Sequence, residues 1–244
     1  MKKAASIILA FVLTASCSGG DAPAPAKDAA PNAESDDIDA EINLDLWLER
    51  LEVGSRELFS AREAVVEAVG LEEGDWVGDI GAGTGLYSLL FAEEVGDDGR
   101  IFAEDIEPLF LDLITRRTHD AGVKNVTAVL GRTDDVTLPG NSVDVMFIAD
   151  TYHYFDDRET IMRTIYEALK PGGLLVLVEY EISPGEDRPD YKSHVRFGKT
   201  GVISEIEYIG FEFVDEPEVE GLTENYLVRF RKPETVGADN SGAE

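Results

Sequence analysis

The sequence predicts an α/β fold, in which a doubly wound, mostly parallel sheet of seven strands includes an antiparallel closing strand. Short apolar runs alternate with segments of helical periodicity, which is the pattern of a parallel sheet covered on both faces. One run, at 174–182, is apolar enough to be buried on both faces. The last two strand-like runs follow each other without a full helix between them, so we expect one of them to run antiparallel.

The individual elements follow from apolar periodicity and from turn residues. Strands are expected at 76–80, 100–106, 126–131, 143–150, 174–182, 211–214 and 225–230. Helices are expected at 86–95, 108–119, 158–170 and 203–210, with two more within 47–70. Pro108 occupies the favoured first turn of its helix. Asp156 or Asp157 can cap the helix that starts near Arg158, and PGG at 171–173 is expected to stop it.

The first 41 residues differ in composition from the rest of the 244-residue chain. Two lysines, a short apolar run at 4–13 and small residues up to Cys17 are typical of a secretory signal. A membrane-spanning helix would need about 20 apolar residues. LTASC at 13–17 resembles the bacterial lipobox, which implies a signal at 1–17 and a lipid on Cys17. The alternative is an ordinary cleaved signal with an incidental cysteine.

Two further segments contain few large apolar side chains that a core could bury. Residues 18–41 are rich in Ala, Pro, Gly and acids, and we expect a disordered linker there and a similar tail at 233–244. The folded domain is therefore expected at 42–232. With the lipid on Cys17, the chain would be an exported lipoprotein, anchored in the bacterial cell envelope on the periplasmic side. Cys17 is the only cysteine, which excludes an intramolecular disulfide.

The formal net charge of −29 limits the possible partners. An acidic surface repels phosphate backbones, so we expect no nucleic-acid partner. The same charge argues against direct docking onto anionic lipid, and it leaves the tether on Cys17 as the expected route to a membrane.

A glycine-rich loop, DIGAGTG at 79–85, follows the first expected strand. Ligands of parallel α/β sheets bind beyond the carboxyl ends of the strands, and alternate glycines let a ligand approach the backbone. A dinucleotide is one candidate, but Gly85 comes one residue too early for its G-x-G-x-x-G fingerprint. S-adenosylmethionine fits better, because Asp79 can accept from its ammonium group while loop amides face its carboxylate. The same acid would repel a pyrophosphate.

DIGAGTG resembles motif I of the class I S-adenosylmethionine-dependent methyltransferases, and LKPGGLLVLVEY at 169–180 is similar to the segment around that family's fifth strand. The resemblance implies a Rossmann-like fold, S-adenosylmethionine as cofactor and a small-molecule methyl acceptor. It implies that Asp105 holds the ribose, with Glu104 as the competing choice. The implied cofactor-binding residues are Asp79, Gly81, Ala82, Gly83, Thr84, Gly85, Asp105, Ile106 and, as candidates near the adenine, Thr133 and Asp134.

The segment DTYHYF at 150–155 ends the fourth expected strand, beside the position where the resemblance implies the methyl group. His153 is the candidate base, or it holds the acceptor. Tyr152 can contact the acceptor or face the sulfonium, because aromatic rings attract cations. Asp150 can orient either group, and as a carboxylate at the end of a buried strand it needs a partner. The alternative for His153 is packing beneath the helix near Arg158.

Two other regions can shape an acceptor pocket. His194 and Arg196 lie in a polar insertion, with a solvated loop as the alternative. The first helical segment, with Trp47, Glu52, Arg56 and Glu57, is a candidate lid; a salt-bridged surface helix is the alternative. No cluster of His, Asp and Glu has convincing metal spacing, so no metal is expected.

The leading hypothesis is therefore an S-adenosylmethionine-dependent methyltransferase that acts on a small molecule. An exported domain would lie apart from a cofactor that is made inside the cell. The second hypothesis is accordingly an envelope-anchored binding or scaffold protein that keeps this fold without methyl transfer. A nicotinamide-dependent oxidoreductase is disfavoured by the spacing of the third glycine.

Overall fold

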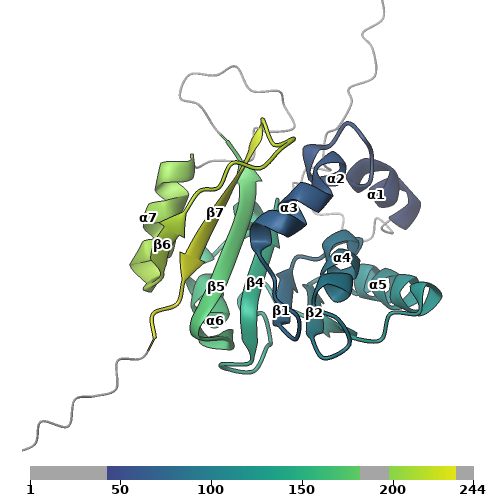
Figure 1. Ribbon diagram of the computed structural model, residues 1–244, viewed down its shortest axis with the longest axis horizontal. Coiled ribbons are helices and arrows are strands. Elements are labelled where there is room, and N and C mark those ends of the chain that lie inside the picture. The colour runs from purple at the N-terminus through teal and green to yellow at the C-terminus, as the bar shows by residue number, and fades with distance from the viewer. Residues whose placement is uncertain (1–42, 182–197, 235–244) are drawn as a thin grey trace, which may run out of the picture.

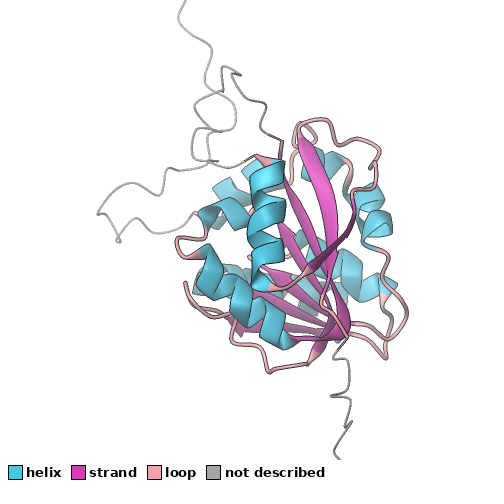
Figure 2. Cartoon of the chain, turned by 90° about the vertical axis from the view of Figure 1, so that its left-hand side faces the viewer, coloured by secondary structure: helices cyan, strands magenta, loops and turns pink. Residues whose placement is uncertain are grey.

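The computed structural model describes residues 43–181 and 198–234. They form one sheet of seven strands in the order β3-β2-β1-β4-β5-β7-β6, with helices on both faces (Figure 1 and Figure 2). The pairs from β3 to β5 are parallel. β7 runs antiparallel to both β5 and β6. The predicted fold class is confirmed, including the antiparallel closing strand.

The strands are β1 (Trp76–Ile80), β2 (Arg100–Asp105), β3 (Val126–Leu130), β4 (Val143–Ala149), β5 (Leu169–Tyr180), β6 (Glu212–Asp215) and β7 (Asn225–Arg231). The helices are α1 (Leu44–Leu51), α2 (Glu57–Ser60), α3 (Arg62–Val69), α4 (Leu86–Glu94), α5 (Pro108–Ala121), α6 (Arg158–Ala168) and α7 (Lys199–Ile209). A single 3-10 turn, η1 (Tyr152–Tyr154), follows β4.

The structure differs from the prediction in the N-terminal helices, at the end of α6 and at the start of α7, which begins at Lys199 and not at 203. Three helices occupy the N-terminal segment instead of two, because the chain leaves helical geometry again at Ala61, between α2 and α3. PGG does not stop α6 either. The helix ends at Ala168, and Leu169 is already extended. Pro171 disfavours a helical conformation at Lys170, so the helix cannot continue to PGG. The chain is extended from Leu169 onwards, and PGG lies within β5.

Alternation along β4 divides the core into two layers. Met146 belongs to the layer that packs against α6 and α7, together with Ile165. Phe147 belongs to the opposite layer, beneath α3 and α4, where its ring centroid lies 4.9 Å from that of Phe91. Neighbouring side chains of a strand point to opposite faces. The alternation therefore explains how one apolar strand serves both layers.

Several predicted segments lie outside the described residues. They are the signal at 1–17 with Cys17, the linker at 18–41, residues 235–244 of the tail, and His194 and Arg196. Among the helices of the described ranges, none is long and apolar enough to cross a membrane.

Lys232 ties the end of the last strand to the end of α6. Its Nζ donates to the carbonyl oxygens of Leu169 (2.6 Å) and Tyr166 (2.7 Å), and to Oδ1 of Asn141 (3.2 Å). The side chain is nearly buried, and burial lowers the pKa of its ammonium group. A cation at the carboxyl end of a helix satisfies carbonyls that have no partner within the helix.

We expect Lys232→Met to lower the free energy of unfolding by about 2 kcal/mol, because it leaves buried carbonyl oxygens without their charged donor. Urea denaturation followed by circular dichroism measures the loss. The matched control is Lys124→Met at an exposed position, where a change below about 0.5 kcal/mol is expected. Equal losses in the two variants would contradict the capping role.

Candidate functional site

The site lies where the strand order reverses, between the carboxyl ends of β1 and β4. Ile80 and Ile148 are paired across these strands, so the glycine loop after β1 meets the residues that follow β4. A Cβ atom on Gly81 would collide with the side chain of Thr151, and Gly81 has a φ of +66°. Both the close approach of the two loops and the backbone conformation therefore require glycine at this position.

Backbone amides of the glycine loop have partners within the protein. Gly81 N donates to Oε2 of Glu104 (3.3 Å), and Gly83 N donates to Oδ2 of Asp105 (2.9 Å). The amides of Ala82 and Gly85 donate to carbonyl oxygens. We expected loop amides to face a ligand carboxylate, and for these four amides the structure shows otherwise. The acids that end β2 hold the shape of the loop instead.

Three carboxyl groups are buried beneath this loop: Asp79, Glu104 and Asp105. Asp79 accepts from Oγ of Ser88 at 2.5 Å. Burial raises the pKa of Asp79 to about 7 and that of Glu104 to about 8, and the negative charge of Asp105 adds to both. Burial also raises the pKa of Asp105. The cluster is short of positive charge, and a cationic ligand would relieve this repulsion.

The two acids that competed for the ribose role are placed differently. Glu104 is enclosed between the loop and Gly131, where a Cβ atom would overlap its carboxylate. Asp105 ends β2, and its second oxygen accepts from Glu107 N at 2.9 Å. Asp105 is thus the acid at the carboxyl end of β2, as its position in the sequence predicted.

Beyond β2 and β3 lies an apolar surface. Ile106 and Leu130 are each 55% exposed, and Leu130 pairs with Asp105 across the two strands. Thr133 and Asp134 are exposed in the turn that follows β3. The sequence analysis named Ile106, Thr133 and Asp134 but missed Leu130. The signal for Leu130 was an apolar residue near the end of the strand expected at 126–131.

Asp150 is held by two long-range partners. It accepts from Nη2 of Arg56 and from Nδ2 of Asn225, both at 2.8 Å. Burial raises the pKa of Asp150, and the charge of Arg56 opposes that rise. Asp150 also has a φ of +47°, a strained conformation that costs about 1 kcal/mol and is concentrated at functional sites. The prediction that this acid needs a partner is confirmed, although the sequence analysis did not identify which residues provide it.

His153 forms a buried pair with a residue that the sequence analysis did not single out. Its Nδ1 lies 2.8 Å from both carboxylate oxygens of Glu179, near the end of β5. The two side chains are 4% and 1% exposed. A single acid within the apolar run LLVLVEY was the signal that could have found Glu179.

Tyr152 does not share this environment. Its ring is buried in the layer against α6 and α7, and its hydroxyl donates to Oε2 of Glu205 at 2.8 Å. Arg158 holds the same carboxylate through Nε at 2.8 Å. Of the three residues proposed for chemistry after β4, Tyr152 is therefore the one that packs into the core, away from its expected contact with acceptor or sulfonium.

The N-terminal helices cover the glycine loop, and Figure 1 shows α1 and α2 above α4 and α5. Leu51 lies 3.6 Å from where a Cβ of Gly83 would be. Arg117 pairs with Glu52 and donates to the carbonyl oxygen of Thr84 at 2.9 Å. With Arg56 bound to Asp150, these contacts match the expected lid.

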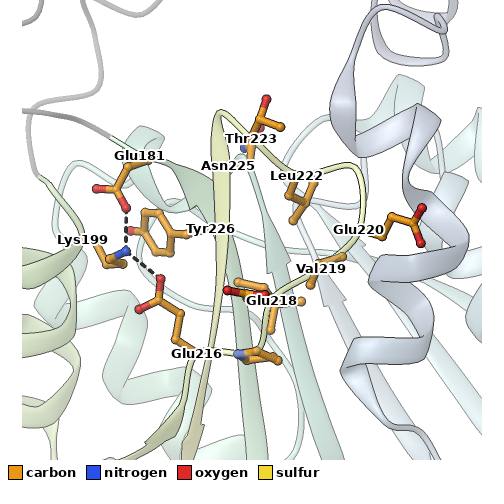
Figure 3. A pocket seen from close by; sticks show the side chains of 12 residues that line it. Glu181, Lys199, Glu216, Glu218, Val219, Glu220, Leu222, Thr223, Asn225 and Tyr226 are labelled. Carbon is orange, nitrogen blue, oxygen red and sulfur yellow. Dashed lines mark hydrogen bonds and ion pairs between the residues drawn. The ribbon is translucent and has the colours of Figure 1, made fainter.

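A cavity of about 560 Å³ lies beside the start of β7 (Figure 3). Asn225, which donates to Asp150, is part of its wall. Lys199 pairs there with Oε2 of Glu181 (2.7 Å) and Oε1 of Glu216 (2.6 Å), and Glu218 and Glu220 add to the acidic rim. Within the part of the chain that the structure describes, no group of His, Cys, Asp and Glu is arranged to hold a metal ion.

The raised pKa of Glu104 predicts a pH-dependent stability. Ionisation favours the unfolded state, so the contribution of Glu104 is fully present below its unfolded pKa and is lost as the pH rises through about 8. We expect the stability of Glu104→Gln relative to the unsubstituted protein to increase between about pH 5 and about pH 9. Urea denaturation across this range measures the difference. Glu94→Gln, at an exposed position, should show no such trend, and a decrease for Glu104→Gln would refute the assignment.

Comparisons with known proteins agree with this geometry. Residues 78–177 match the family described as "Methyltransferase domain". Ubiquinone/menaquinone biosynthesis C-methyltransferases of Enterobacter sp. (strain 638) and Azotobacter vinelandii are 31% and 34% identical over 116 residues, which is 47% of this chain and 46% of each relative. The chain thus spans about half the length of the curated relatives it matches.

Among solved structures, a SAM-dependent methyltransferase from Aquifex aeolicus shares the fold. Its TM-score is 0.67 at 23% identity, over 79% of this chain and all of that one. The sheet order and the glycine loop agree with these matches. The comparisons therefore show that residues 78–177 are similar to a methyltransferase domain.

Proposed function

We propose that this protein transfers a methyl group from S-adenosylmethionine to a small-molecule acceptor. The observation that carries the proposal is the buried acid cluster of Asp79, Glu104 and Asp105 at the glycine loop. S-adenosylmethionine brings an ammonium and a sulfonium group, which the cluster attracts, whereas a pyrophosphate would be repelled. When bound, the cofactor supplies a methyl group on an activated sulfur leaving group.

Different residues around the loop would bind different parts of the cofactor. Asp79, the penultimate residue of β1, would accept from the ammonium group. Asp105, at the end of β2, would hold the ribose hydroxyls. Ile106 and Leu130 offer apolar surface to a flat base, and Thr133 and Asp134 lie in the following turn. Each role fits the chemistry of the side chain that the fold places there.

The acceptor would lie on the β4 and β5 side of the loop. Asp150, Arg56 and Asn225 form its charged wall, and the cavity of Figure 3 adjoins it through Asn225. The curated relatives are C-methyltransferases by name; for this chain we propose only that the acceptor is small, because α1 and α2 cover the loop. Alignment of acceptor and methyl group can contribute about 7–11 kcal/mol in favourable models.

We also propose that the chain is exported and tethered to the bacterial envelope, on the periplasmic side, through a lipid on Cys17. The support is the basic, apolar and small-residue pattern of 1–17, followed by the acidic, proline-containing segment 18–41. This location favours a second candidate function, an envelope-anchored protein that binds S-adenosyl compounds without transferring a methyl group.

Binding of S-adenosylhomocysteine tests the cofactor assignment. We expect a micromolar Kd by calorimetry and about tenfold weaker binding for Asp79→Asn, because the variant loses a charge-assisted contact. Affinity should also rise as the pH passes upward through about 7, where Asp79 ionises. Glu94→Gln is the control. Absence of binding, or binding of NADH in its place, would refute the proposal.

Methyl transfer separates the two candidate functions. We expect tritium to pass from labelled S-adenosylmethionine to components of a metabolite extract with the unsubstituted protein, and far less with Asp79→Asn. Binding of S-adenosylhomocysteine without any labelled product would instead favour the binding protein.

The anchor is tested separately, by detergent phase partition of cells that express the full chain. We expect the unsubstituted protein in the detergent phase and Cys17→Ala in the aqueous phase. If both proteins partition into water, the lipid assignment is wrong.

A further inference from the structure

His153 and Glu179 form a buried pair on the acceptor side of the site, and cofactor binding as described above does not use it. His153 lies in η1 after β4, and Glu179 is the penultimate residue of β5. The two side chains come from neighbouring strand ends, and Nδ1 of His153 lies 2.8 Å from both carboxylate oxygens of Glu179.

The carboxylate of Glu179 is fixed by several donors. It accepts from the backbone amides of His153 (3.3 Å) and Tyr180 (2.9 Å) in addition to the imidazole. Burial of a carboxylate in an apolar strand is costly unless it is paired, and here these donors compensate for it. The carboxylate is therefore held in one orientation toward the ring.

A carboxylate on Nδ1 determines the tautomer of a neutral imidazole. The proton stays on Nδ1, because a carboxylate only accepts, and the lone pair is then on Nε2. An imidazole in this state can take a proton through Nε2, and the imidazolium that results is stabilised by the same carboxylate. The pair thus has the arrangement of a positioned general base.

Aromatic side chains surround the pair. The ring centroid of His153 lies 4.1 Å from that of Tyr154 and 6.2 Å from that of Tyr180. Tyr154 is 46% exposed, so part of an aromatic face is accessible next to the buried imidazole. Such a face suits a flat, apolar ring that carries a polar group.

We propose that Glu179 positions His153 as the proton acceptor of methyl transfer, and that the acceptor is a phenol methylated on its hydroxyl oxygen. This inference rests on the proposed function. The phenol oxygen forms the new bond to the methyl carbon, while the electrons of the carbon–sulfur bond go to sulfur. The hydroxyl proton moves to Nε2 of His153. The products are S-adenosylhomocysteine, an aryl methyl ether and an imidazolium paired with Glu179.

The charges at the site stay balanced in this step, since one positive charge moves from sulfur to the imidazole. The charged and titratable groups near His153 include Glu179 on β5, Asp150 after β4, and Tyr154 and Tyr180, whose rings lie next to the imidazole. Arg56 binds Asp150.

The first test is the tautomer of His153, which does not depend on methyl transfer. The chain has three histidines, so nitrogen-15 NMR of the full chain can be assigned with His119→Asn and His194→Asn. At about pH 8 we expect Nδ1 protonated and Nε2 unprotonated, and we expect Glu179→Gln to lose this preference. An Nε2-protonated ring, an imidazolium at that pH, or an unchanged pattern in Glu179→Gln would overturn the inference.

The second test is the atom that receives the methyl group. Labelled product from the extract is treated with hydriodic acid, which releases methyl groups from ethers as methyl iodide. We expect the label in methyl iodide and, after chromatography, in an aryl ether. Label that stays on carbon or nitrogen would overturn the phenol assignment while leaving the proposed function intact. If the unsubstituted protein does not bind S-adenosylhomocysteine, the proposed function itself is wrong.

Kinetics then separate positioning from folding. We expect Glu179→Gln to lower kcat about 100-fold with little change in KM for the cofactor, and to alter the pH profile of kcat. Glu179→Asp keeps a carboxylate and should recover part of the rate. Glu94→Gln is the control, because Glu94 is exposed on α4. An equal loss in all three variants, or a rate that is unaffected by Glu179→Gln, would contradict the positioning role.

Discussion

The four central strands of the sheet bring buried carboxyl groups to one edge, and each of these acids needs a partner there. Parallel strands necessarily align their carboxyl ends, so acids near the ends of β1, β2, β4 and β5 are crowded together. The partners differ: Ser88 for Asp79, loop amides for the acids of β2, Arg56 and Asn225 for Asp150, and His153 for Glu179. The shape of the site follows from where these partners of the buried acids lie.

These partners give the two halves of the site different electrostatics. At the glycine loop the donors are a hydroxyl and backbone amides, so burial and mutual repulsion raise the pKa values of Asp79 and Glu104. On the other side, a guanidinium and an imidazole face Asp150 and Glu179. One half therefore favours a cationic ligand, whereas in the other half Arg56 compensates the charge of Asp150 and His153 contacts Glu179. A sulfonium donor and a protic acceptor match this division.

The N-terminal helices connect both halves. Glu52 reaches the glycine loop through Arg117, Arg56 binds Asp150, and Glu57 accepts from the backbone amides of Thr223, Glu224 and Asn225. A single short segment thus contacts the loops after β1, β4 and β6. In the proposed methyl transfer, this cover would keep water from a developing charge, where it would weaken every electrostatic contact.

Local patterns in the sequence determined the strands, the seven-stranded sheet with its antiparallel strand, and the positions of Asp79, Asp105, Asp150 and His153, because these depend on apolar periodicity and on turn chemistry over a few residues. Only the tertiary structure determined which residues pair with Asp150 and His153. Arg56 and Asn225 lie far from Asp150 in the chain, and Glu179 meets His153 because β4 and β5 are neighbours. Tyr152 turns into the core for the same reason, since α6 and α7 pack over that face. Such contacts depend on strand order and register, which no short stretch of sequence encodes.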